Sequence, residues 1–327
     1  EFWRYREFLP IRKSENIVRL GEVMTPLLPA SKLQKELGCG EILIKDEGRL
    51  PTGSFKARGL AVAVAMAKEL GVTRMAMPTN GNAGAALAAY CSRADIETFV
   101  FCPQDTPQVN IQEIAFQGAK TFLVNGYIND CGKIVGDGKD IMDWFDVSTL
   151  KEPYRIEGKK TMGLELAEQL EWKVPDVILY PTGGGTGLIG MWKAFKEMLS
   201  MGWISGPLPR MVVAQSDGCA PVVEAFQNHQ DATSFWHKSN TIALGLNVPG
   251  PIGGYWILEI LSESSGIAVT AQETSLEINT ENFRKRIGID ASTEIGVVWS
   301  AYEELTEKKW ITPREKVVLF ATGIERR

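Results

Sequence analysis

The sequence predicts an α/β fold with two open, mostly parallel sheets and helices on both faces. Short apolar runs alternate with amphipathic or alanine-rich stretches along most of the 327 residues, which is the pattern of β-α-β units. With 44% hydrophobic residues, the chain is able to bury more than one core. No internal repeat or low-complexity tract stands out.

The alternation is regular from Ile42 onward. The expected strands are 42–45, 74–78, 98–101, 121–124, 177–180, 211–214, 267–270 and 316–320. The expected helices are 55–70, 83–93, 107–117, 130–145, 162–170 and 188–199, with Ser54 as N-cap and Gly71 as the stop of the first. Segment 147–159 contains Pro153 and Gly158, so we expect an irregular link and a domain boundary near it.

Composition excludes several classes of function. The net charge is -5 and the basic residues are scattered, which argues against nucleic-acid binding. The longest apolar stretch, 60–67, is too short to span a membrane. Five widely spaced cysteines without a C-x-x-C pair are typical of reduced thiols in the cytoplasm. A start at Glu1 and an end at Arg327, shortly after the last motif, leave room for missing terminal segments.

Histidine is scarce in this chain. His229 and His237 lie in one polar stretch, where we interpret both as surface or partly packed residues rather than as metal ligands or a catalytic triad. We therefore expect no metal site, and lysine is the candidate for acid–base chemistry.

A lysine stands at the start of the first predicted helix. The loop P-T-G-S-F-K (51–56) follows a strand and opens a helix, which places Lys56 against the positive end of the helix dipole. That position disfavours the ammonium form and lowers the amine pKa, as a Schiff-base lysine requires. A solvated lysine near a helix start explains the position alone equally well.

Two further loops also lead from a strand into a helix. P-T-N-G-N-A-G (78–84) exposes backbone N–H groups that suit a carboxylate or a phosphate, although a tight turn is the simpler interpretation. T-G-G-G-T-G (182–187) favours phosphate binding, because its amides approach a ligand without side-chain obstruction.

The glycine-rich loop allows a second interpretation. Gly185, Gly187 and Gly190 form a G-x-G-x-x-G pattern, and Asp217 lies past the next strand, as in a dinucleotide-binding dehydrogenase. Such a fingerprint usually opens its domain, whereas this one follows several α/β units. At the last strand, the Thr322 hydroxyl is placed to hydrogen-bond a heteroaromatic nitrogen, although Thr-Gly is also common in turns.

Together the four loops resemble those of fold-type II enzymes that use pyridoxal phosphate (PLP). The motifs are P-T-G-S-F-K-A-R-G (51–59), P-T-N-G-N-A-G (78–84), P-T-G-G-G-T-G (181–187) and A-T-G (321–323). Within that superfamily the chain is most similar to the threonine synthases, through W-R-Y-R-E-F-L-P (3–10), T-P-L-L (25–28), K-D-E-G (45–48) and E-G-K-K-T (157–161). The resemblance covers almost the whole chain. It departs at Ala57, where threonine synthases commonly have aspartate.

The resemblance implies a role for each loop. Lys56 would form the internal aldimine with PLP and move protons, with Phe55 packed near the ring. Asn82 would hold the phenolate oxygen, and Thr322 would meet the pyridine nitrogen. The cofactor phosphate would be bound by Gly183, Gly184, Gly185, Thr186 and Gly187. The substrate carboxylate would be bound by Thr79, Asn80, Gly81, Asn82 and Ala83. The weaker candidates for the substrate phosphate are Arg155, Lys160 and Thr161.

The implied enzyme is a lyase that converts O-phosphohomoserine and water into threonine and phosphate. The resemblance further implies a homodimer and a site in a cleft between two domains. The expected large PLP-binding domain comprises residues 1–58 and 148–327, and a small domain of residues 59–147 carries the Asn82 loop.

Several alternatives remain at this stage. A serine or threonine dehydratase, or an enzyme like cysteate synthase that uses phosphoserine, would keep the same four loops. From other classes, the alternatives are a dinucleotide-binding dehydrogenase and a PLP-binding protein without catalytic activity.

Overall fold

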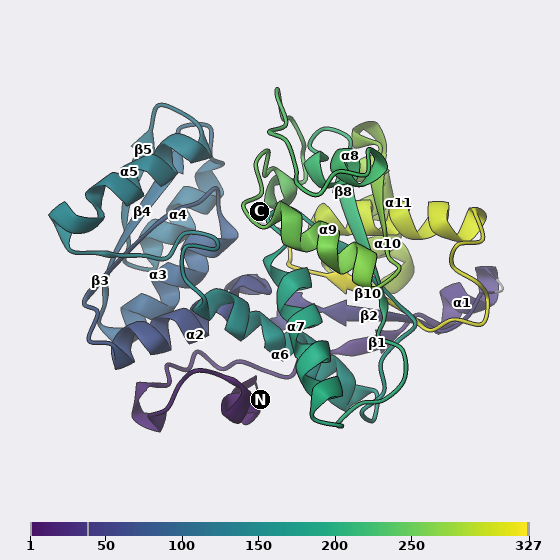
Figure 1. The fold of residues 1–327 in the computed structure, drawn as a ribbon. Helices are drawn as coiled ribbons and strands as arrows, with labels where there is room; N and C mark the ends of the chain where they lie inside the picture. The colour runs from purple at the N-terminus through teal and green to yellow at the C-terminus, as the bar shows by residue number, and fades with distance from the viewer. Residues whose placement is uncertain (1, 38, 326–327) are drawn as a thin grey trace. The chain divides into compact units, whose positions relative to one another are not determined.

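The computed structural model describes residues 2–37 and 39–325 and contains two sheets. Contacts group these residues into two compact units. Unit 1 comprises residues 2–24 and Leu50–Thr161, and unit 2 comprises Thr25–Arg49 and Met162–Glu325. Each unit has one mostly parallel sheet with helices on both faces, so the predicted fold class is confirmed (Figure 1).

Unit 2 is built on a six-stranded sheet in the order β1-β2-β10-β7-β8-β9. Only β1 runs antiparallel to its neighbour. The strands are β1 (Leu27–Pro29), β2 (Ile42–Asp46), β7 (Val177–Pro181), β8 (Arg210–Ser216), β9 (Ile267–Ala271) and β10 (Val317–Ala321). The helices are α1 (Ser31–Leu37), α7 (Thr186–Ser200), α8 (Pro221–Gln227), α9 (Gly254–Glu263), α10 (Leu276–Ile287) and α11 (Glu294–Glu307).

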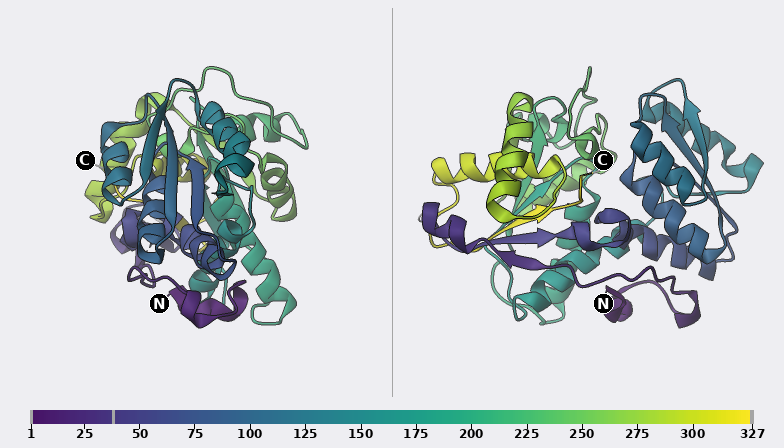
Figure 2. Two further views of the ribbon diagram at one scale, coloured as in Figure 1. Left: turned by 90° about the vertical axis from the view of Figure 1, so that its left-hand side faces the viewer. Right: turned by 180° about the vertical axis from the view of Figure 1, so that it is seen from behind.

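Successive residues of the unit 2 strands are buried on opposite faces of the sheet. Val177 and Leu179 of β7 share a core cluster with Phe283 of α10 and Trp299 of α11. Tyr180 points the other way, against α7. Figure 1 shows α7 and α9 in front of this sheet, and Figure 2 shows α11 behind it. Burial on both faces explains why these strands are continuous apolar runs in the sequence.

Unit 1 has a four-stranded parallel sheet in the order β5-β4-β3-β6. Met75 and Met77 of β3 pack with α2 and α3, whereas Ala76 packs with Val135 of α5. The strands are β3 (Arg74–Pro78), β4 (Glu97–Pro103), β5 (Lys120–Val124) and β6 (Phe145–Asp146). The helices are α2 (Lys56–Glu69), α3 (Asn82–Ala94), α4 (Gln108–Phe116) and α5 (Ile128–Met142). A further helix, α6 (Tyr154–Gln169), begins in unit 1 and ends in unit 2.

The expectation of an irregular link over 147–159 is confirmed for residues 147–153 and was wrong for residues 154–159. Helix α6 begins at Tyr154, eight residues before the expected start at 162. Pro153 precedes the helix, where its missing N–H costs no intrahelical bond. The Glu152 carboxylate accepts the N–H of Arg155 at 3.1 Å and so caps the first turn.

Two smaller expectations were also wrong. Helix α5 ends at Met142 rather than at 145, because Asp143 takes a left-handed conformation with φ 51° and Phe145 pairs with Met75 in the sheet. Ser54 does not cap α2: Phe55 is the N-cap residue, and among the described residues the Ser54 hydroxyl has no partner. Gly71, with φ 73°, ends α2 as expected.

The two units divide the chain at positions other than 58 and 148. Residues 2–24, 50–58 and 148–161 group with the four-stranded sheet, because the N-terminal segment and the first half of α6 pack on α2. How the two units share PLP stays a prediction.

Within residues 2–37 and 39–325, no helix is both long enough and apolar enough to cross a bilayer.

Gly158→Ala should destabilise the protein, because an added Cβ would overlap the backbone carbonyl of Arg58. We expect the free energy of unfolding to fall by ~2–3 kcal/mol, measured by urea denaturation. Gly136→Ala, at an open position in α5, is the control and should gain ~0.5–1 kcal/mol. Equal effects of the two substitutions would contradict the close helix contact.

Candidate active site

Lys56 is the first residue of α2. Its Nζ lies 4.4 Å from the centre of the Phe55 ring, which is within the range of a cation–π contact. The side chain is half-buried. The position expected from sequence, at the positive end of a helix dipole, is therefore confirmed, with the aromatic ring as an additional neighbour.

A second lysine contacts the same ring. Lys159 on α6 is completely buried, its Nζ lies 4.1 Å from the centre of the Phe55 ring, and it donates a hydrogen bond to the Phe55 carbonyl. Burying an ammonium group costs several kcal/mol, and these two contacts offset that cost by about 0.5–2 kcal/mol for the cation–π contact and about 1.5–3 kcal/mol for the hydrogen bond. Lys159 lies within the E-G-K-K-T motif, but no local pattern in the sequence distinguishes it from its neighbours.

Two glycines allow Lys159 to reach the start of α2. A Cβ on Gly59 would lie 2.9 Å from the carbonyl oxygen of Arg155 and 3.1 Å from Cε of Lys159. A Cβ on Gly158 would overlap the Arg58 carbonyl. Without side chains at these two positions, the backbones of α2 and α6 approach closely.

The Asn82 loop turns from β3 into α3 around the hydroxyl of Thr79. This oxygen accepts the N–H groups of Gly81 at 3.1 Å and Gly84, the third residue of α3, at 3.3 Å, whereas the N-cap residue Gly81 has no side chain to cap the helix. The first N–H groups of a helix have no intrahelical partner, so Asn82 and Ala83 begin α3 at a position suited to an anion.

A residue that sequence reasoning missed supports this loop. Asn110 of α4 is buried, and its Nδ2 donates to the carbonyl oxygen of Asn80 at 2.9 Å. The turn Pro51–Gly53, just before Lys56, also contacts α3. Unit 1 therefore brings the Lys56 loop and the Asn82 loop close together.

In unit 2 the glycine-rich loop leads from β7 into α7, which begins at Thr186 without a side-chain cap from any described residue. A Cβ on Gly183 would lie 2.8 Å from the Gly245 carbonyl, and a Cβ on Gly187 would overlap the Tyr180 hydroxyl. Gly185 has φ 72° and faces Ile257. Packing thus requires these three glycines, and α7 begins without a side-chain cap from its N-cap residue, Gly185.

Thr322 lies beside this loop. Strands β7 and β10 are parallel neighbours with Leu179 paired to Leu319, so their carboxyl ends lie side by side. Thr322 follows β10 directly and is buried. Unit 2 therefore brings Thr322 and the glycine-rich loop together at one edge of its sheet, the edge at which α/β proteins bind ligands.

The three candidates for the substrate phosphate already have partners within α6 and its neighbours. Arg155 Nη1 donates to the Val147 carbonyl at 2.9 Å, and burial lowers the pKa of its guanidinium. Lys160 pairs with Glu157 at 2.8 Å. The Thr161 hydroxyl donates to the Gly158 carbonyl at 2.7 Å and accepts from Arg58 at 3.1 Å. These contacts pair Lys160 and Thr161 within α6 and its neighbours, whereas Nε of the buried Arg155 has no hydrogen-bond partner among the described residues. Phosphate binding by the three residues stays a prediction.

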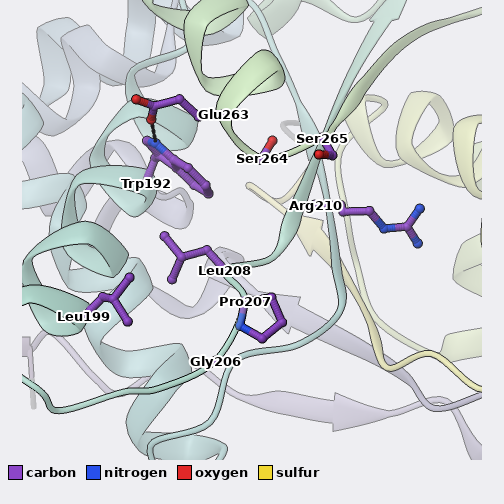
Figure 3. Close-up of a pocket in the computed structure, with 9 residues that line it drawn as sticks. All are labelled: Trp192, Leu199, Gly206, Pro207, Leu208, Arg210, Glu263, Ser264 and Ser265. Carbon is purple, nitrogen blue, oxygen red and sulfur yellow. Dashed lines mark hydrogen bonds between the residues drawn. The ribbon is translucent and has the colours of Figure 1, made fainter.

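A surface depression in unit 2 lies away from these loops. It occupies about 540 Å³ near the amino end of β8, which begins at Arg210. Its polar groups are already paired: Trp192 donates to Glu263 at 2.7 Å, and Arg210 pairs with Glu315 at 2.6 Å. Figure 3 shows the Arg210 guanidinium directed away from Trp192. Both histidines are exposed, as expected. Neither feature competes with the loops as the active site.

Comparison with known families decides the class of protein. A family model described as pyridoxal-phosphate dependent enzyme matches residues 18–323. The chain belongs to this family of PLP-dependent enzymes. It is a PLP-dependent lyase, so the alternatives of a dehydrogenase and of a non-catalytic PLP-binding protein are not supported.

Similar proteins within the PLP-dependent family include curated threonine synthases. That of Methanocaldococcus jannaschii is 33% identical over 98% of this chain and 79% of the relative, and that of Methanosarcina acetivorans is 30% identical over 98% and 78%. Among solved structures, the processed form of threonine deaminase isoform 2 from Solanum lycopersicum has a TM-score of 0.79 at 18% identity, covering 99% of this chain and 89% of that one. Diaminopropionate ammonia lyase from Escherichia coli has a TM-score of 0.80 at 18% identity, covering 98% and 92%. At this identity, the structural likeness supports the fold.

The residues of both units fit PLP. The uncapped start of α7 suits its phosphate, because side-chain-free amides and the helix dipole both favour an anion. A lysine on an aromatic ring at a helix start suits its aldehyde, and the buried Thr322 hydroxyl suits an uncharged ring nitrogen.

Gly187→Ala should weaken PLP binding, because its Cβ would displace Tyr180 or the first turn of α7. We expect the Kd for PLP to rise at least ~10-fold in equilibrium dialysis, which corresponds to the loss of about one charge-assisted hydrogen bond. Gly136→Ala, at an open position in α5, is the control and should leave Kd unchanged. Unchanged affinity in Gly187→Ala would place the cofactor phosphate elsewhere.

Proposed function

We propose that this enzyme converts O-phosphohomoserine and water into threonine and phosphate. The observation that carries this proposal is that threonine synthases are 30–33% identical to the chain over 98% of its length. The solved structures of similar fold include deaminases and racemases at 18–23% identity and so do not discriminate between reactions.

We further propose that each loop contributes as the resemblance implies. Lys56 would hold PLP through Nζ, Asn82 would bind the ring oxygen, and Thr322 would bind the ring nitrogen. Residues 183–187 would bind the cofactor phosphate, and residues 79–83 the substrate carboxylate. When bound, PLP supplies a ring that stabilises negative charge on the carbon atoms beside the substrate amino group.

Proton transfer would rest on Lys56. Both histidines are exposed in the polar segment after α8, so a mobile lysine is the candidate base among the loop residues. Its Nζ would take the proton from Cα of the substrate and act next at Cβ. Phosphate would leave from Cγ as a proton is taken from Cβ, and Cγ would then take up a proton. The hydroxyl of water would add at Cβ, and a proton would return to Cα.

Ala57 stands where threonine synthases commonly have aspartate. Its side chain is fully buried in an apolar cluster that includes Phe2, Leu60 and Met77. This residue therefore contributes to the packing of α2. The proposed candidates for the choice between phosphohomoserine, phosphoserine, serine and threonine are Arg155, Lys160 and Thr161.

Lys56→Ala should abolish both the visible absorption band of the bound cofactor and turnover. We expect kcat to fall by at least ~1000-fold, because the residue would serve both as cofactor ligand and as base. Lys68→Ala is the matched control, since Lys68 is an exposed lysine on the same helix. A Lys56→Ala enzyme with the wild-type band and turnover would refute this role.

A substrate screen separates the proposed reaction from the alternatives. We expect phosphate release from O-phosphohomoserine with a kcat/KM at least ~100-fold above those for phosphoserine, serine and threonine. Phosphate and ammonia are measured in parallel. Faster ammonia release from threonine or serine would identify a dehydratase, and preferred phosphate release from phosphoserine would identify an enzyme like cysteate synthase.

A further inference from the structure

Lys159 contacts the residue that immediately precedes Lys56. We propose that Lys159 is a positioning residue, which holds Phe55 and so fixes the orientation of the Lys56 amine at the start of α2. This inference rests on the proposed function, because it takes Lys56 as the residue that holds PLP.

Three contacts carry the proposal. The Lys159 ammonium donates to the Phe55 carbonyl, which belongs to the peptide unit between Phe55 and Lys56. It also lies 4.1 Å from the centre of the Phe55 ring, whereas Nζ of Lys56 lies 4.4 Å from the same point. One ring therefore contacts both amines, and its main chain is anchored by one of them.

Packing alone does not explain a charged residue at position 159. An unbranched apolar side chain, such as methionine, would pass the Gly59 backbone and fill the same space. The ammonium group instead contacts the carbonyl and the ring of Phe55, and the Lys56 amine contacts the same ring. A buried charge that contacts both the ring and the carbonyl of the residue before Lys56 is placed to orient that residue.

The effect on catalysis follows from geometry. Lys56 must reach more than one substrate carbon, and a misplacement of about 1 Å can reduce a rate by ~100-fold. If Phe55 loses its anchor, the Lys56 amine is expected to lose its fixed orientation while remaining able to hold the cofactor.

The test compares the holoenzyme of K159M, K159Q and K68M with the wild type. The readouts are the visible absorption band, the visible circular dichroism of the bound cofactor, kcat and KM for O-phosphohomoserine, and thermal unfolding. Methionine removes the hydrogen bond and the charge, whereas glutamine retains a donor for the Phe55 carbonyl. Lys68 is exposed on the same helix and is the control.

We expect K159M to keep the visible band, to lose roughly half of the ellipticity and to lower kcat by ~10–100-fold with KM changed by less than ~3-fold. K159Q should lie between K159M and the wild type, and K68M should match the wild type. If K159M does not fold, K159Q decides by the same criteria. If K159M folds, wild-type ellipticity and a wild-type kcat in K159M would overturn the proposal. If K159M does not fold, the same two results in K159Q would overturn it.

The outcomes also separate this inference from the proposed function. If Lys56→Ala loses the visible band and K159M keeps the ellipticity and kcat of the wild type, Lys56 remains the cofactor ligand and Lys159 has no positioning role. Retention of the band in Lys56→Ala would instead refute the proposed function itself. The circular dichroism needs no substrate, so it remains informative if phosphohomoserine is not turned over.

Discussion

The backbones of α2 and α6 approach so closely that neither Gly59 nor Gly158 has room for a side chain. Much of the candidate site in unit 1 depends on this contact. It brings the buried Lys159 to the carbonyl of Phe55, and it buries Arg58 against Thr161. The start of α2, which carries Lys56, is therefore held by contacts with α6 rather than by a side-chain cap.

Glycine also shapes the loop between β7 and α7 in unit 2. There glycine is required by packing at 183, 185 and 187, and the helix that follows begins without a side-chain cap from its N-cap residue. Because β7 and β10 are parallel neighbours, Thr322 follows at the same edge of the sheet. The steric need for glycine and the electrostatic suitability for a phosphate thus coincide in one loop.

The parts of this site that follow from local sequence could be predicted. Each of the four loops joins a buried strand to a helix or ends a strand, and that alternation is visible without tertiary information. The start of α6 could not be predicted, because Pro153 and Gly158 resemble helix breakers locally and are accommodated only through the Glu152 cap and the contact with α2. Lys159 was missed for the same reason, since the buried face of a helix depends on where the helix begins. Ser54 was assigned as a cap on residue type alone, and the helix begins one residue later than that assignment required.

Chemical mapping of the cofactor attachment tests the central role of Lys56 most directly, because two lysines contact the same ring. The holoenzyme is reduced with borohydride and digested, and the modified peptide is sequenced by mass spectrometry. We expect the reduced cofactor on Lys56, with Lys159 unmodified. Attachment to Lys159, or to a lysine outside the loop 51–56, would contradict this assignment.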